Sequence, residues 1–146
     1  MPSGSDVSVN GRRLPLPSGV VRRVVEAVLA GERRRAYISI TFIGRDAMRR
    51  LNARHKGNDE PTDVITFALR EPEGRAVGDV YVCPWVAGRS ARAARIPLRE
   101  ELVRLIVHGT LHAQGFDHEG DADATSMEAR ETAILAGLGF ADPYAG

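Results

Sequence analysis

The chain has 146 residues, of which 43% are hydrophobic and 27% are charged, a composition typical of one globular domain with a sizeable core. No run of about 18 apolar residues occurs, no signal peptide is evident and the single cysteine, Cys83, excludes an intrachain disulfide, so we expect a cytoplasmic protein. The net charge of +1 combines a basic part, with 19 Lys or Arg against 12 Asp or Glu over residues 1–104, with an acidic part over residues 105–146. A surface for a polyanion is one interpretation and an ordinary solvated surface is the other.

Apolar periodicity and turn residues predict an alternation of strands and helices along the chain. In chain order the pattern predicts a strand or hairpin edge over 6–16, a helix from 18 to about 29, a strand over 36–44, a short helix over 46–54, strands over 64–69 and 79–83, a weak helix from 84, a helix from 97 to 115 and a last helix over about 123–138. The helix from Pro97 is the most apolar, so we expect it to be largely buried. Helices interleaved with about four strands indicate a layered α/β arrangement with this helix at its centre.

Three of the four histidines lie in the segment HGTLHAQGFDH, residues 108–118. His108 and His112 are one helical turn apart, so both rings should project from the same face. Gly115 stands where the helix should end, and the chain can then return His118 as a third ligand. Three neutral imidazoles with an open fourth position are typical of a catalytic zinc site. The alternative is that the histidines are unrelated and serve as core or capping residues.

The spacing HxxxHxxGxxH is also that of the metzincin metalloproteases, with one difference. Those proteases place a glutamate directly after the first histidine, where it acts as the general base. Gly109 occupies that position here. Peptide hydrolysis would lack its proton acceptor, which contributes roughly 10²–10⁴-fold to the rate, so the sequence disfavours a protease.

The segments HGTLHAQGFDH, LNARHKGNDEPTDVITF, GDVYV and MEARETAIL together resemble the YbeY family of bacterial rRNA-maturation factors. The first is similar to the family signature HGxLHLxGYDH, and the second to its segment LNxxYRxxDxPTDVLSF. The match covers most of residues 40–138 within one domain that spans residues 1–146. The resemblance implies an α+β fold in which a mixed four-stranded sheet is packed with about five helices and the metal-binding helix is central.

The resemblance also implies an activity. Members of the family are described as zinc-dependent, single-strand-specific endoribonucleases that mature the 3′ end of 16S rRNA and take part in ribosome quality control. For this chain it implies one Zn²⁺ held by His108, His112 and His118, with single-stranded RNA or an rRNA precursor as substrate. It further implies an association with the small ribosomal subunit or its proteins and none with a membrane. The sequence does not indicate an oligomeric state.

One position departs from the family pattern. The arginine to which the family owes part of its activity corresponds to Lys56, which keeps the positive charge but loses the planar fork that grips phosphate. Lys56 is therefore a candidate for stabilising charge on the phosphate, and an exposed loop lysine is the other interpretation. With only 5% aromatic residues, we expect base stacking to contribute little to RNA binding.

Four further residues are candidates for the surroundings of the site. Thr62, Asp63 and Asp79 lie in segments that match the family and are candidates to line the cleft. The alternative is a structural role, in which Thr62 and Asp63 form a turn after Pro61 and Asp79 fixes the loop behind Gly78. Asp117 either orients an imidazole or caps the helix. Two other functions stay open at this point. One is a ribosome-associated assembly factor with a mainly structural metal, and the other is a zincin-like metallohydrolase of another substrate.

Overall fold

The computed structural model describes residues 6–30, 36–71, 75–115 and 121–140, and these form four strands and five helices. In chain order they are β1 (Asp6–Asn10), α1 (Ser18–Leu29), β2 (Ala36–Phe42), α2 (Arg45–Lys56), β3 (Val64–Arg70), β4 (Ala76–Val82), α3 (Pro84–Ala94), α4 (Leu98–Ala113) and α5 (Asp121–Gly137). The predicted α+β class, with a mixed four-stranded sheet and five helices, is confirmed. None of the helices in the described part is long and apolar enough to cross a bilayer.

The sheet has the strand order β1-β2-β4-β3. β1, β2 and β4 are parallel, whereas β3 pairs with β4 in the antiparallel direction. The hairpin-edge option for residues 6–16 is wrong, because β1 runs parallel to β2 and α1 connects the two strands. β4 begins at Ala76, three residues before its predicted start, because β4 pairs with both neighbouring strands over its whole length.

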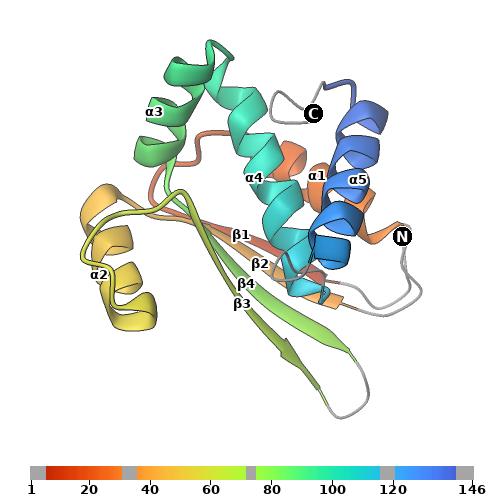
Figure 1. The fold of residues 1–146 in the computed structure, drawn as a ribbon, viewed down its shortest axis with the longest axis horizontal. Helices are drawn as coiled ribbons and strands as arrows, with labels where there is room; N and C mark the ends of the chain where they lie inside the picture. Colours follow the sequence, from red (N-terminus) through yellow and green to blue (C-terminus); the bar gives the residue numbers. More distant parts are fainter. Residues whose placement is uncertain (1–5, 31–35, 72–74, 116–120, 141–146) are drawn as a thin grey trace.

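The two faces of the sheet are covered by different helices. Figure 1 shows α1, α4 and α5 together over one face, with α2 set apart from them. The main core lies beneath α1, α4 and α5 and includes Val80 and Val82 of β4. The alternate residue Tyr81 belongs instead to a smaller cluster that is built on Met48 of α2 and Ile65 of β3. The period of two along a strand therefore assigns α2 to the sheet face opposite α4.

α1 illustrates how the apolar pattern produces this packing. Its buried side chains recur at the three- and four-residue spacing that marks one helix face, and they are Val21, Val24, Val25, Val28 and Leu29. The carbonyl of Pro17 accepts hydrogen bonds from the amides of Val20 and Val21, at 3.0 and 3.2 Å, and so starts the helix. The predicted bounds of this helix are confirmed.

Candidate metal centre

The helix α4 carries His108 and His112, and local sequence signals explain where this helix begins and ends. Pro97 precedes its first residue, and Glu100 and Glu101 lie in the first turn, where carboxylates are stabilised by the helix dipole. The helix ends at Ala113, and Gly115 has a φ of 100° while its amide donates to the carbonyl of His112 at 3.0 Å. A left-handed residue at this point suits glycine, which has no Cβ to clash. The predicted role of Gly115 as the end of the helix is confirmed.

His108 and His112 project from the same face of α4. Their ring centroids lie 6.4 Å apart with an angle of 67° between the ring planes. The side chain of His108 is 26% exposed, so the pair lies at the edge of the core and not within it. Two imidazoles at this separation can approach one ion from neighbouring directions. The prediction that the two rings share one face of the helix is confirmed, and their binding of a metal stays a prediction.

Gly109 lies against the sheet and not beside the two imidazoles. A Cβ built on Gly109 would lie 2.5 Å from Cγ1 of Val80 and 3.3 Å from Oγ1 of Thr66. One turn further on, a Cβ on Gly78 of β4 would overlap Cβ of Ala113. The last turns of α4 therefore cross β4 and β3 so closely that position 109 has no room for a side chain. A protease-like glutamate at this position would be sterically excluded and would point away from the histidines.

A carboxylate that the sequence pattern did not single out contacts the first histidine. Nδ1 of His108 hydrogen-bonds Oε1 of Glu131, which belongs to α5 and whose side chain is only 9% exposed. An ionised carboxylate only accepts, so Nδ1 is the donor in this bond, and a neutral ring in this tautomer presents its lone pair on Nε2. The signal for this residue was present, because Glu131 falls midway between the buried Met127 and Leu135 at four-residue spacing. A carboxylate in a buried stripe is costly unless a cation or a hydrogen-bond donor pairs with it, so its presence predicts such a partner.

This donor set fits a zinc ion. Zinc-bound imidazoles commonly donate their second ring N–H to a carboxylate, which fixes both the tautomer and the orientation of the ring. His108 has this arrangement with Glu131, and His112 adds a second nitrogen from the same helix face. Among the described residues no group of three potential ligands assembles. The predicted third ligand, His118, and its neighbour Asp117 lie outside the described residues.

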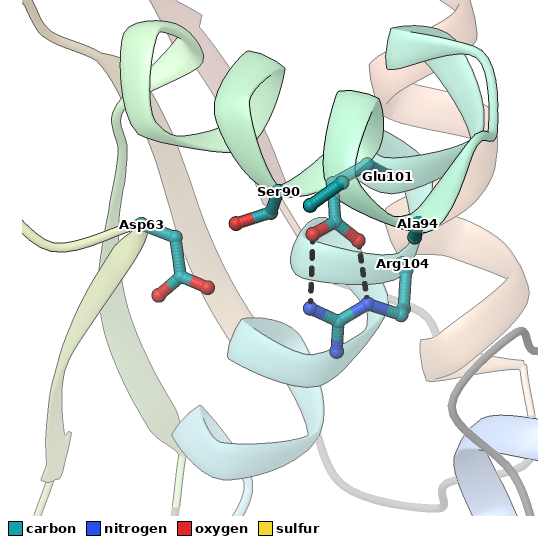
Figure 2. A pocket seen from close by; sticks show the side chains of 6 residues that line it. Asp63, Ser90, Ala94, Glu101 and Arg104 are labelled. Atoms are coloured by element: carbon teal, nitrogen blue, oxygen red, sulfur yellow. Dashed lines mark hydrogen bonds and ion pairs between the residues drawn. The ribbon is translucent and has the colours of Figure 1, made fainter.

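A polar stripe continues from the histidines toward the start of α4. Glu101 lies two turns before His108 and Arg104 lies one turn before it, and the two form a bidentate ion pair with N–O distances of 2.7 and 3.4 Å. The Glu101 side chain is 1% exposed and that of Arg104 16%. A pocket of about 460 Å³ lies beside this pair. Figure 2 shows Asp63 of the β3 entry on its opposite side, with Ser90 of α3 between Asp63 and the pair. The pair is intrahelical, and the Arg104 guanidinium compensates the charge of the buried Glu101 carboxylate.

Comparison with known proteins identifies the family of the chain. The family described as Endoribonuclease YbeY matches residues 16–139 of the chain. The chain belongs to the YbeY family. YbeY proteins from Acidovorax sp. (strain JS42) and Cupriavidus necator are 43% and 44% identical to it, over 96% and 93% of this chain and 90% and 68% of their own. The solution structure of a Thermotoga maritima protein has the same fold, with a TM-score of 0.64 at 24% identity over 90% of this chain and 91% of that one.

Lys56, the candidate for stabilising charge on the phosphate, is the last residue of α2. It is exposed, and the left-handed Gly57, with a φ of 74°, ends the helix directly after it. The neighbouring His55 stacks edge-on against Phe67 of β3 with a centroid distance of 4.5 Å, so this helix end packs on the face opposite α4. Within the described residues, no hydrogen bond or ion pair joins Lys56 to His108 or His112. Its role in the YbeY reaction stays a prediction.

The other candidate residues of this YbeY chain have distinct positions. Asp79 of β4 stands opposite Phe67 and is exposed on the face away from α4, so it does not lie beside the histidines. Asp63 accepts a hydrogen bond from the amide of Val64 at 2.8 Å and one from the hydroxyl of Thr62 at 3.5 Å. These local bonds agree with the turn interpretation of Thr62 and Asp63. Asp63 also lines the pocket beside Glu101, so it lies nearer the polar stripe than Asp79 does.

Proposed function

We propose that this chain is a zinc-dependent endoribonuclease that cleaves single-stranded RNA and matures the 3′ end of the small-subunit rRNA in the cytoplasm, in association with the small ribosomal subunit. Its membership of a family described as endoribonucleases supports hydrolysis of RNA phosphodiester bonds. The observation that carries the metal dependence is the pair of imidazoles on α4, one of them held by a buried carboxylate. The exclusion of a side chain at position 109 argues against peptide hydrolysis.

The residues of the chain divide the work of this reaction. His108 and His112, with His118 as the third ligand, would hold the zinc, and Glu131 would orient the His108 ring. A bound zinc ion supplies Lewis acidity at the scissile phosphate. Lys56 would place a point charge near the non-bridging phosphate oxygens, without the bidentate hydrogen bonds that arginine can donate. The intrahelical Glu101–Arg104 pair would stabilise the part of α4 that precedes the histidines.

The test combines metal content with cleavage. We expect the purified protein to contain one zinc per chain and to cleave single-stranded RNA but neither duplex RNA nor casein. His112→Ala should lose both zinc and cleavage, while its circular dichroism spectrum stays that of the wild type. Bound zinc without cleavage of any RNA, rRNA precursors included, would favour an assembly factor instead. Hydrolysis of casein would contradict the proposal.

Lys56 is tested separately with two variants. If its charge assists the reaction, Lys56→Ala should lower kcat with little effect on zinc content. Lys56→Arg, which restores the family residue, should equal or exceed the wild type. Equal rates for all three proteins would show that this residue has no part in the chemistry.

A further inference from the structure

Trp85 is exposed and surrounded by arginines. It is the only tryptophan in the chain, lies in the first turn of α3 and is 42% exposed. The guanidinium of Arg45 from α2 lies 5.1 Å from the centre of its ring, and that of Arg89 from α3 lies 4.9 Å from it. Both cations contact the indole through its negatively charged face. The exposed ring therefore makes two cation–π contacts, one with α2 and one within α3.

A groove beside Trp85 carries more positive charge. It has a volume of about 670 Å³ and is formed where the segment after β1, the end of β2, the first turns of α2 and the start of α3 meet. Three of its lining residues are arginines, Arg12, Arg13 and Arg50. Its lining, which is drawn from the described residues, contains no acidic side chain. We call this groove, together with Arg45 and Arg89, the Trp85 groove.

Among the described residues, the charges of the Trp85 groove are poorly balanced. Of its five arginines, Arg45 has an acidic neighbour, Asp46, at 3.4 Å, and both side chains of that pair are more than half exposed. Exposed pairs of this kind contribute little. Five like charges around one groove repel one another, which destabilises the free protein. A bound polyanion relieves this repulsion, and the release of its counterions further favours binding. The groove therefore favours an external ligand with several negative charges.

The Trp85 groove is continuous with the polar stripe that leads to the histidines. A second depression contains Trp85 and Arg89 together with Ser90 and Ala93, and one acidic residue, Glu60, also lines it. Ser90 and Ala93 also line the pocket of the Glu101–Arg104 pair, which begins one turn before His108. At 1.5 Å per helical residue, Trp85 and Ala93 are about 12 Å apart along α3, so a chain of a few nucleotides would cover this path. A flexible, extended ligand matches the shape better than a compact one.

We propose that the Trp85 groove binds single-stranded RNA next to the segment that is cleaved. A base stacks on Trp85 or on one of the guanidinium planes that cover it, and phosphates are neutralised by Arg12, Arg13 and Arg50. The proposal deepens the endoribonuclease function and rests on it for the path toward the histidines. RNA is favoured over an acidic protein because the groove offers a stacking surface as well as charge. Under this proposal, base stacking on the single ring of Trp85 contributes to RNA binding although the aromatic content of the chain is low.

Because Trp85 is the only tryptophan, its fluorescence reports on this groove alone. The zinc-loaded protein is titrated with a single-stranded oligonucleotide of about 16 residues that carries 2′-O-methyl riboses to block attack by the 2′-OH. We expect saturable quenching with the same midpoint as the anisotropy of a labelled oligonucleotide. Trp85→Ala should weaken binding by about 5- to 150-fold, the range expected for loss of one stacked base, and Trp85→Phe should weaken it much less.

Charge is tested with two matched double variants. Arg12→Ala/Arg13→Ala removes two arginines from the groove, whereas Arg23→Ala/Arg99→Ala removes two exposed arginines from α1 and α4. In the first variant, the slope of log Kd against log salt concentration should fall by about 1.4, which is 0.7 for each lost phosphate contact. The second variant should leave slope and affinity near those of the wild type.

These measurements distinguish failure of the groove proposal from failure of the nuclease proposal. Normal binding by Trp85→Ala, or equal losses in the two double variants, would overturn the groove proposal even if RNA is cleaved. Quenching and salt-dependent binding without RNA cleavage would overturn the nuclease while the groove stands. Polyglutamate serves as a charged probe without bases. If it binds as tightly as the oligonucleotide, the groove is a site for an acidic protein and the RNA proposal is wrong.

Discussion

The close contact between α4 and β4 makes the substitution Gly109→Ala a direct test of how the histidines are positioned. Alanine is the smallest residue with a Cβ, and that atom would lie 2.5 Å from Cγ1 of Val80, well inside van der Waals contact. Both atoms are buried, since Val80 is fully inaccessible and belongs to the main core. The helix must therefore move away from the sheet or Val80 must leave its rotamer.

Two opposing effects determine the magnitude. Alanine is better than glycine in a helix by about 0.8–1 kcal/mol, which favours the variant. Forcing an extra carbon into a packed core costs about 1–3 kcal/mol, and more where backbone has to shift. The Val80 side chain is branched and fully buried, so it cannot easily move aside. We therefore expect the steric cost to exceed the gain in helix propensity and the free energy of unfolding to fall by about 1–2 kcal/mol. The shift of α4 should also weaken zinc binding, because both imidazoles move with the helix.

The assay is urea unfolding followed by circular dichroism, with zinc affinity measured by competition with a chelator. Gly88→Ala is the matched control, because Gly88 lies inside α3 and a Cβ there meets nothing within 4 Å. It should stabilise the protein by about 0.4–1 kcal/mol through helix propensity and chain entropy alone. The two substitutions should thus act in opposite directions although their chemistry is the same.

A double-mutant cycle with Val80→Ala isolates the contact. Removing both γ-carbons of Val80 opens the space that the new Cβ needs, so Gly109→Ala should cost less in the Val80→Ala background. Neighbours in direct contact show coupling of about 0.5–3 kcal/mol. If Gly109→Ala stabilises the protein as Gly88→Ala does, or if the cycle shows no coupling, the packing argument for position 109 is refuted.

The remaining predictions concern buried polar groups. Glu131→Gln should weaken zinc binding about 10- to 100-fold in a chelator competition, while the exposed Glu128→Gln on the same helix should not; equal affinities would show that Glu131 does not orient His108. Arg104→Met separates the buried carboxylate of Glu101 from its partner and should cost about 3–5 kcal/mol in urea unfolding, most of which Glu101→Leu/Arg104→Met should recover. Burial raises the pKa of the Cys83 thiol, so a thiol reagent at pH 8 should modify it slowly in the folded protein and rapidly in urea; rapid reaction of the folded protein would contradict its burial.

The local geometry of the site could be predicted because it depends on neighbouring residues. His108 and His112 share a helix face because an α-helix repeats every 3.6 residues, whatever surrounds it. Gly115 marks the end of the helix because a left-handed residue is needed there. The absence of an acid at position 109 is likewise visible in the sequence. Its physical reason is not, since it depends on how closely the helix approaches β4.

Residues distant in the sequence meet only through the packing of the elements. Glu131 reaches His108 across 23 positions because α5 packs on α4, and periodicity within α5 alone does not say which helix its buried face will contact. Asp79 could be assigned to a strand, but the face on which it lies follows from the register between β3 and β4. A shift by one residue would reverse that face.

The same distinction applies to the surface. The sequence by itself determined the fold class, the helical spacing of two metal ligands and an excess of arginine in the first 104 residues. Only the tertiary structure decided that Arg12, Arg45, Arg50 and Arg89 gather around Trp85. The physical reason is that backbone hydrogen bonding sets the direction of side chains within one helix or strand. The proximity of separate segments depends on the side chains with which each element is packed against the others.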